Sequence, residues 1–183
     1  AKCFTEIVEK YPKSRFRENA INQVGRSEIQ QGKFLEAMQF LKLNEDTSGE
    51  ISLEQNYLKA FVYQQLKDYK KAVVAYDQCI AQEGKLYKED SWFQKLNCLV
   101  ALGPMQDAQK HAALMLKIFP ETAYLADVNY ILAESSEKQG QIENAIKHYR
   151  IALKTYTGNW PYVENAYFAL AAALAKKELF SDA

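Results

Sequence analysis

The sequence predicts an all-α protein in which antiparallel pairs of helices stack into a solenoid. Three observations lead to this prediction: a short motif recurs along the chain, apolar residues recur at helical spacing within each copy, and a short turn interrupts that spacing once per copy. The motif is centred on an alanine, found at Ala37, Ala72, Ala108, Ala145 and Ala183. Successive copies lie 35, 36, 37 and 38 residues apart. Such periods are typical of arrays in which each unit packs mainly against its neighbours.

The first complete unit, residues 17–51, illustrates how each helix pair is inferred. Its apolar residues follow one another at three- and four-residue steps, as a helix requires, except at Gln31-Gly32-Lys33. We therefore expect two amphipathic helices joined by a tight turn, where Gly32 adopts the left-handed backbone that ends the first helix. Equivalent turns are expected at Lys67-Asp68, Leu102-Gly103-Pro104, Gln139-Gly140-Gln141 and Lys177-Glu178.

The same pattern divides the whole chain into a single array. Complete units are expected at 17–51, 52–87, 88–124 and 125–161. Residues 1–16 correspond to the second helix of a truncated leading unit, and residues 162–183 to a truncated last unit with a first helix and the start of its partner. Loops between units, for example at 45–50 and 157–161, are expected to take up the extra residues of the longer intervals.

Small side chains are predicted to let the two helices of a unit approach closely. On the second helix this residue is the repeating alanine, and on the first helix it is Gly25, Ala60, Ala133 or Ala171. The third unit has Leu96 at this position, so its helix pair is expected to be splayed or shifted. Four residues after the repeating alanine, and one turn further along the same face, we expect the residue that fills the space between units. This residue is Leu41, Tyr76, Ala112 or Tyr149.

These residues resemble the tetratricopeptide repeat (TPR) family, whose pattern is W-x2-L-G-x2-Y, then A-x3-F, then P. The first unit offers Ile21-x2-Val24-Gly25 and Ala37-x3-Leu41, and the second offers Ala60-x2-Tyr63 and Ala72-x3-Tyr76. The resemblance covers nearly the whole chain. It implies a right-handed superhelical TPR solenoid in which the first helix of each unit lines a concave groove. It also implies that a protein or peptide partner binds along that groove.

Two junctions between units share an aromatic-Pro-x-Ser/Thr sequence, Tyr11-Pro-Lys-Ser and Phe119-Pro-Glu-Thr. Ser14 and Thr122 are suited to capping the helix that follows. These junctions are similar to those of bacterial cell-envelope TPR proteins, which favours a periplasmic or cell-envelope location slightly over the cytoplasm. The alternative is that any array of this kind can use a proline stop and a hydroxyl cap.

Composition and motifs argue against several functional classes. Lys plus Arg equals Asp plus Glu at 23 each, so no net charge draws the chain to nucleic acid or an anionic membrane. No apolar run approaches the roughly 20 residues of a membrane helix. Phosphate-binding loops and metal-ligand spacings are absent from the sequence, His111 and His148 lie more than a repeat apart, and the three cysteines are scattered. We therefore expect a non-enzymatic protein without a cofactor or bound metal.

The candidate partner site is the concave groove that the family resemblance implies. Residues one unit apart form columns along it, one of them largely aromatic and its neighbours polar or acidic, with Asp90 and Asp127 among the acids. An aromatic strip flanked by acids would suit a peptide with apolar anchors and some basic residues. The alternative is that the rings pack between adjacent first helices as core. The candidate residues are Asn22, Arg26, Tyr57, Phe61, Phe93, Asn97, Tyr130, Glu134 and Phe168.

Asn22 and Arg26 stand where the family's peptide-carboxylate clamp has Lys and Asn, so the resemblance does not extend to that recognition mode. Two alternatives to a monomeric adaptor remain. One is a regulatory TPR domain of a larger protein. The other is self-association through the ends of the array, where apolar side chains lack a covering neighbour. These are Phe4 and Ile7 at one end, and Leu174, Leu179 and Phe180 at the other.

Overall fold

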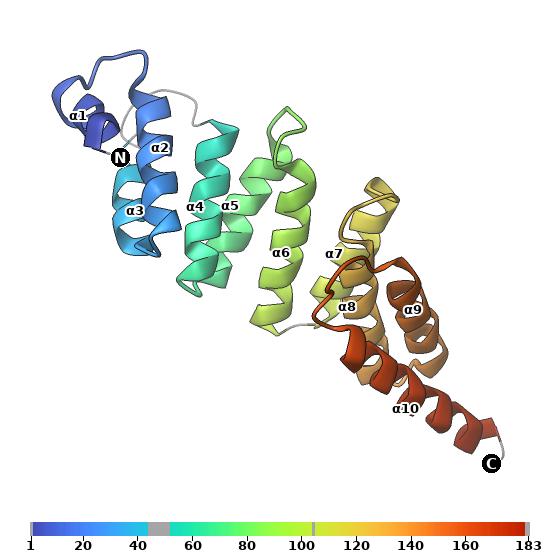
Figure 1. Cartoon of the computed structure of the whole chain (residues 1–183). Helices are drawn as coiled ribbons and strands as arrows, with labels where there is room; N and C mark the ends of the chain where they lie inside the picture. The colour runs from blue at the N-terminus through green and yellow to red at the C-terminus, as the bar shows by residue number, and fades with distance from the viewer. Residues whose placement is uncertain (1, 44–51, 104, 182–183) are drawn as a thin grey trace. The chain divides into compact units, whose positions relative to one another are not determined.

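The computed structural model describes residues 2–43, 52–103 and 105–181, and within these ranges every regular element is an α-helix (Figure 1). Within each compact part of the chain, consecutive helices pack as antiparallel pairs, so the all-α, paired-helix prediction is confirmed. Their bounds are α1 Lys2–Lys10, α2 Arg17–Gln30, α3 Phe34–Leu41, α4 Leu53–Gln65, α5 Tyr69–Ala81, α6 Lys88–Leu102, α7 Met105–Ile118, α8 Leu125–Lys138, α9 Ile142–Thr155 and α10 Val163–Ser181.

The chain forms two compact units, Ala1–Leu102 and Gly103–Ala183. In the first, consecutive helices from α1 to α6 pack against one another, and α4 also contacts both α2 and α6. In the second, α8 packs against α7 and α9, and α9 packs against α10. The division falls within the third predicted repeat, the one with Leu96 in place of a small residue. The splay of that helix pair stays a prediction.

Four of the predicted turns adopt the backbone that ends a helix. Residues Gly32, Lys67, Gly103 and Gly140 all have positive φ, at 74°, 61°, 103° and 73°. In three of these turns an amide bonds back across six residues to a carbonyl of the preceding helix: Lys33 to Glu28, Asp68 to Tyr63 and Gln141 to Ser136, each at 2.9 Å. This hydrogen bond is the signature of a Schellman C-cap. The chain can therefore reverse direction at once and start the second helix.

The turn predicted at Lys177-Glu178 does not form, because α10 continues without a break to Ser181. The residues around it are alanine, leucine, lysine and glutamate, which are among the strongest helix formers, and no glycine interrupts them. This part of the prediction was wrong. The repeat alanine at Ala183 and the predicted loop at 45–50 lie outside the described residues.

The repeating alanine lies in the core of each described unit. Ala37, Ala72, Ala108 and Ala145 are completely buried, as are Ala60 and Ala133 on the first helices. At Gly25 a β-carbon would lie only 2.8 Å from Cδ2 of Leu41, itself completely buried, so any larger residue there would force the Leu41 side chain to shift. Ala171 is the exception and is exposed. Ala171 was expected to contact a second helix in the last unit. Within the described residues, α10 instead runs on through the position of the predicted turn.

The residues four positions after the repeating alanine are also buried, as predicted. Leu41, Tyr76, Ala112 and Tyr149 are each at most 1% exposed. Leu41 packs with Ile21, Leu58 and Val62 in a cluster that joins neighbouring helix pairs of the first compact unit. One apolar position per repeat thus serves both the contact within a pair and the contact between pairs.

The two proline junctions fold differently from the prediction. Ser14 and Thr122 do not cap helices, because α2 and α8 begin three residues after them, with Phe16 and Tyr124 at the N-cap positions. Each hydroxyl oxygen instead accepts a hydrogen bond from the amide two residues later, at 3.2 Å in both cases. These are turns closed by a side chain, a local alternative that serine and threonine commonly offer.

Candidate protein-interaction surface

The predicted groove residues lie on the first helices of the pairs: α2, α4 and α6 in the first compact unit, and α8 and α10 in the second. Their exposure differs strongly along the aromatic column. Tyr57 and Phe93 are half-buried, Tyr130 is only 8% exposed and Phe168 is 79% exposed. The four rings therefore do not form one uniform strip, and each has to be considered in its own surroundings.

Tyr57 is part of an aromatic cluster in the first compact unit. Its ring stacks on Tyr87 with centroids 4.4 Å apart, and it meets Tyr76 edge-on at 6.1 Å. Its hydroxyl donates a hydrogen bond to the carboxylate of Asp90 on α6. Tyr57 therefore links α4, α5 and the start of α6. The interpretation of this ring as packing between first helices fits its contacts.

The second compact unit contains an equivalent cluster around Tyr130. Its ring stacks on Tyr162 at 5.0 Å, and it meets Tyr149 and Trp160 edge-on at 5.9 and 5.7 Å. Burial, helped by the carboxylate of Glu134, raises the pKa of the Tyr130 hydroxyl to about 12. Trp160 donates its indole N–H to Asp127 at 3.0 Å. Tyr130 thus serves mainly as core, although it was a predicted groove residue.

The stacking partners of both tyrosines were missed from the sequence. Tyr87, Tyr124 and Tyr162 all stand just before the first helix of a unit, at intervals of 37 and 38 residues. Two of these three are the rings that stack on Tyr57 and Tyr130. The periodic recurrence of an aromatic residue at helix starts was the available signal. Tyr87 also has a positive φ of 60°, a backbone conformation that a non-glycine residue rarely adopts.

Arg26 lies at the centre of a charged network in the first compact unit. Its Nε is 2.6 Å from a carboxylate oxygen of Glu54, and its Nη2 donates to the hydroxyl of Tyr87. Although burial opposes this, the hydrogen bond and charge of Glu54 raise the pKa of Arg26. The charge of Arg26 is therefore already balanced, while its side chain remains 40% exposed and accessible to a partner.

Asn22 is only 3% exposed, so its side chain is buried beneath the candidate surface and does not form part of it. Its amide donates to the hydroxyl of Ser52 at 3.4 Å, and Ser52 accepts a hydrogen bond from the amide of Gln55 at the start of α4. The side-chain oxygen of Asn22 is buried without a hydrogen-bond partner among the described residues. Its observed role is to join α2 to the start of α4.

A ladder of amide side chains joins α4 to α6. Gln64 donates to Gln94 at 3.1 Å, Asn97 donates to the same oxygen at 3.5 Å, and Gln94 donates to Asp90 at 3.4 Å. Asp90 and Asp127, expected as acids facing a basic ligand, thus accept hydrogen bonds from within their own units. Glu134 is half-buried, so its carboxylate is partly open to a ligand.

Chemistry beyond binding finds little support in the arrangement of side chains. Cys79 and Cys98 are completely buried, and burial raises the pKa of each thiol to about 12, so neither is a reactive thiolate near neutral pH. Across the described ranges, no three His, Cys, Asp or Glu side chains are placed to hold a metal ion. None of the helices in those ranges is long and apolar enough to cross a bilayer.

His148 is expected to make the stability of the second compact unit depend on pH. Its Nδ1 lies 2.9 Å from the side-chain oxygen of buried Asn129, and burial, followed by repulsion from Lys147, lowers its pKa below the ordinary 6.5. The imidazole of His148 therefore takes up a proton more readily in the unfolded chain than in the folded protein. Its contribution to stability is fully present above about pH 6.5 and is lost as the pH falls through the folded-state pKa. We expect a lower melting temperature at pH 5.5 than at pH 7.5. In the variant His148→Gln, whose amide can still donate to Asn129, the fall in melting temperature between pH 7.5 and pH 5.5 should be smaller. An unchanged pH dependence would contradict the assignment of this effect to His148.

Comparison with known proteins agrees with this geometry. Models of the tetratricopeptide repeat match residues 56–85 and 127–158, one helix pair in each compact unit. The fold resembles MamA 41-end from Desulfovibrio magneticus RS-1, with 17% identity and a TM-score of 0.69 over 88% of this chain and 85% of that chain. It also resembles YrrB, described as a TPR protein with an unusual peptide-binding site, with 15% identity and a TM-score of 0.69 over 96% and 84%.

A third similar structure is a Podosopora anserina putative kinesin light chain with nearly identical TPR-like repeats, at 18% identity and a TM-score of 0.63 over 93% of this chain and 91% of that chain. A comparison with curated protein sequences gives no match. These findings give no support to the predicted resemblance to cell-envelope proteins. The matches show tetratricopeptide repeats at residues 56–85 and 127–158, and the helix pairs have the fold seen in similar TPR structures such as YrrB.

Proposed function

We propose that this protein is a non-catalytic interaction scaffold that binds a peptide or an extended protein segment on its first-helix face. TPR domains are generally protein-interaction modules, and solenoids of this kind use extended surfaces for binding. The observation that carries the proposal is that Phe61, Phe93 and Asn97 are each only half-buried on the first helices of the first compact unit. They offer apolar and polar atoms together.

The side chains around these three residues are held in place before any partner arrives. Asn97 is bonded to Gln94, which is bonded in turn to Gln64 of α4. Nearby, Arg26 is fixed by Glu54 and Tyr87. A surface whose side chains are already ordered loses less conformational entropy on binding. We assign partner contact to Arg26, Phe61, Phe93 and Asn97, with Glu134 and Phe168 as the counterparts in the second compact unit, and a supporting role to Asn22, Tyr57 and Tyr130.

The experiment is selection from a displayed peptide library, followed by fluorescence anisotropy with the enriched peptides. In the double variant Phe61→Ala/Phe93→Ala we expect at least a tenfold loss of affinity, because partly accessible aromatic rings give a large contact area. Circular dichroism should show unchanged helicity. Leu114→Ala, an exposed apolar residue of α7, is the matched control and should bind as the wild type does. If no peptide is enriched, or the double variant retains full affinity, the proposal fails.

Self-association is the second candidate function. It is favoured by two adjacent exposed aromatic residues on α10, Tyr167 and Phe168, which are 57% and 79% exposed. Phe4 on α1 is also exposed, whereas the side chains of Leu179 and Phe180 lie outside the described part of the chain. Light scattering distinguishes the two candidate functions. A protein that self-associates with a dissociation constant of about 1 micromolar would be largely oligomeric at roughly 100 micromolar. A monomer at that concentration would argue against self-association and favour peptide binding.

A further inference from the structure

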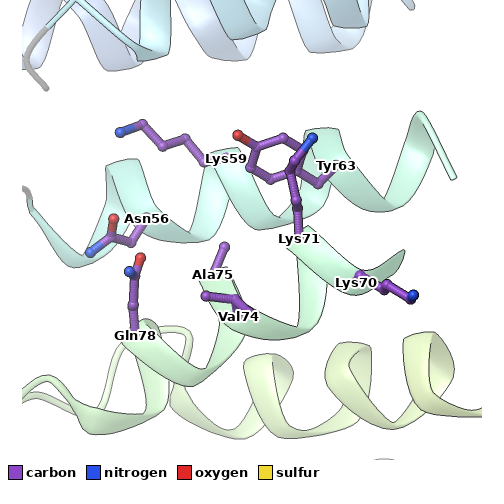
Figure 2. Close-up of a pocket in the computed structure, with 8 residues that line it drawn as sticks. All are labelled: Asn56, Lys59, Tyr63, Lys70, Lys71, Val74, Ala75 and Gln78. Atoms are coloured by element: carbon purple, nitrogen blue, oxygen red, sulfur yellow. The ribbon is translucent and has the colours of Figure 1, made fainter. Parts of the chain in front are cut away.

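A second surface, separate from the first-helix face, is hollowed between α4 and α5. The hollow has a volume of about 530 Å³ (Figure 2). Asn56, Lys59 and Tyr63 line it from α4. These positions form one stripe of the helix, roughly 130° around its axis from the stripe that carries Tyr57, Phe61 and Gln64. Ligands on the two surfaces would therefore not compete for the same side chains.

This hollow continues into a neighbouring one of about 400 Å³ that shares Asn56 and Gln78 and extends to Gln82. Together they follow α5 from Lys70 to Gln82. At 1.5 Å per residue this distance is roughly 18 Å, which is the length of five or six residues of extended chain. The groove, as we call the two hollows together, is thus long enough for a short linear segment.

One end of the groove is basic. Lys70 and Lys71 line this end, Lys59 lines the groove from α4 with its ammonium toward Asn56 (Figure 2), and none of the lining residues that the structure describes carries a carboxylate. Lys71 is bonded to Asp68 at 2.7 Å, just outside the groove, and its ammonium lies 5.7 Å from the centre of the Tyr63 ring. Because the whole chain has zero net charge, this gathering of cations is a local feature. Such clusters in a concave site attract anions.

The rest of the groove is apolar at its middle and rich in amides at its other end. Val74 is 59% exposed although it faces the hollow, and Ala75 forms the floor beside it. Figure 2 shows Asn56 and Gln78 together at one end, and Tyr63 and Lys71 at the other. Asn56 donates to Gln82 at 3.3 Å, so these amides are ordered and can pair with a peptide backbone.

We propose that this groove binds an acidic, extended segment of a partner protein. The carboxylates of the segment would lie against the lysines, an apolar side chain would cover Val74, and its backbone would bond the amides of Asn56 and Gln78. The apolar centre and the amides favour a peptide over a nucleic acid, which would offer phosphates along the whole groove.

The basic hollow of the second compact unit does not share this chemistry. It has a volume of about 510 Å³ and is lined by Lys147, Arg150 and Lys177, but Glu143 lies among them. The carboxylate of Glu143 is 2.9 Å from the ammonium of Lys177, so the hollow already contains its own anion. This difference directs the proposal to α4 and α5.

The test measures binding of three labelled probes by fluorescence anisotropy at low salt. The probes are an acidic hexapeptide of Glu and Asp with one central Leu, the same peptide with Gln and Asn in place of the acids, and a six-nucleotide thymidine strand. We expect the acidic peptide to bind at least tenfold more tightly than the amide peptide, and its binding to weaken with added salt. No binding of the acidic peptide, or equal binding of the other probes, would overturn the proposal.

The double variant Lys70→Gln/Lys71→Gln locates the site. It should weaken binding of the acidic peptide at least fivefold, whereas Lys110→Gln/Lys117→Gln, an equal loss of charge at exposed positions of α7, should change it less than twofold. Phe61→Ala/Phe93→Ala should leave this binding intact, which separates the proposal from that for the first-helix face. Equal losses in both lysine pairs would show non-specific attraction and would overturn the assignment.

Discussion

Replacing Tyr149 with alanine is expected to lower the free energy of unfolding of the second compact unit by about 3–5 kcal/mol, as large aromatic truncations in a core do. The ring is 1% exposed, meets Tyr130 edge-on at 5.9 Å and stands four residues after the repeat alanine Ala145. Its removal would open a cavity where α8 meets α9. Tyr76→Ala should have a similar effect in the first compact unit, because Tyr76 is completely buried and contacts Tyr57.

Urea denaturation followed by circular dichroism measures this loss. Tyr149→Phe is the control, since it keeps the ring and removes only the hydroxyl, which donates to Glu137 at 3.1 Å. That change should cost about 0.5–1.5 kcal/mol, the net value of an ordinary hydrogen bond. A loss below about 1 kcal/mol for the alanine variant would mean that the ring is not part of the core between α8 and α9, because aromatic truncations in a core cost about 3–5 kcal/mol.

Replacing Ala145 with leucine is expected to cost about 1–3 kcal/mol, because a well-packed helix contact cannot take up three more carbon atoms without moving. Ala145 is completely buried where α9 packs on α8. Intrinsic helix propensity does not account for such a loss, since leucine is nearly as good a helix former as alanine.

The exposed Ala171 on α10 is the matched control for this substitution. Ala171→Leu should change the melting temperature little, because substitutions at open surface positions usually alter stability by less than about 0.5 kcal/mol. Thermal denaturation of the two variants compares them directly. Equal melting temperatures for Ala145→Leu and the wild type would contradict the placement of the repeat.

The features that could be predicted from the sequence are those set by single residues repeated at a fixed interval. A buried alanine such as Ala72 is the same steric requirement in every unit, and a turn residue such as Gly140 is the same backbone requirement. Both requirements place the same type of residue at regular intervals, so they can be recognised in the sequence without a structure. The turn expected at Lys177-Glu178 rested on period alone, and strong local helix propensity outweighed it.

The site was harder to predict because its side chains act across units. Asp90 was expected to face a ligand, yet it accepts from Tyr57, which stands 33 residues earlier. Tyr130 and Phe168 hold the same position in successive repeats, yet only Tyr130 is buried. The difference depends on the neighbouring rings that pack on Tyr130, which the repeat position does not reveal. The groove along α5 is lined by residues of both α4 and α5. It could not be predicted from the sequence because it depends on which side of α4 packs beside α5.

Amide chemical-shift mapping on the ¹⁵N-labelled protein, titrated with a peptide enriched by display, tests the central claim most directly. If the first-helix face binds the peptide, the largest shifts should fall on α4 and α6 around Phe61, Phe93 and Asn97, and they should disappear in Phe61→Ala/Phe93→Ala. Shifts confined to α3, α7 or α9, or the same shifts in the double variant, would contradict it.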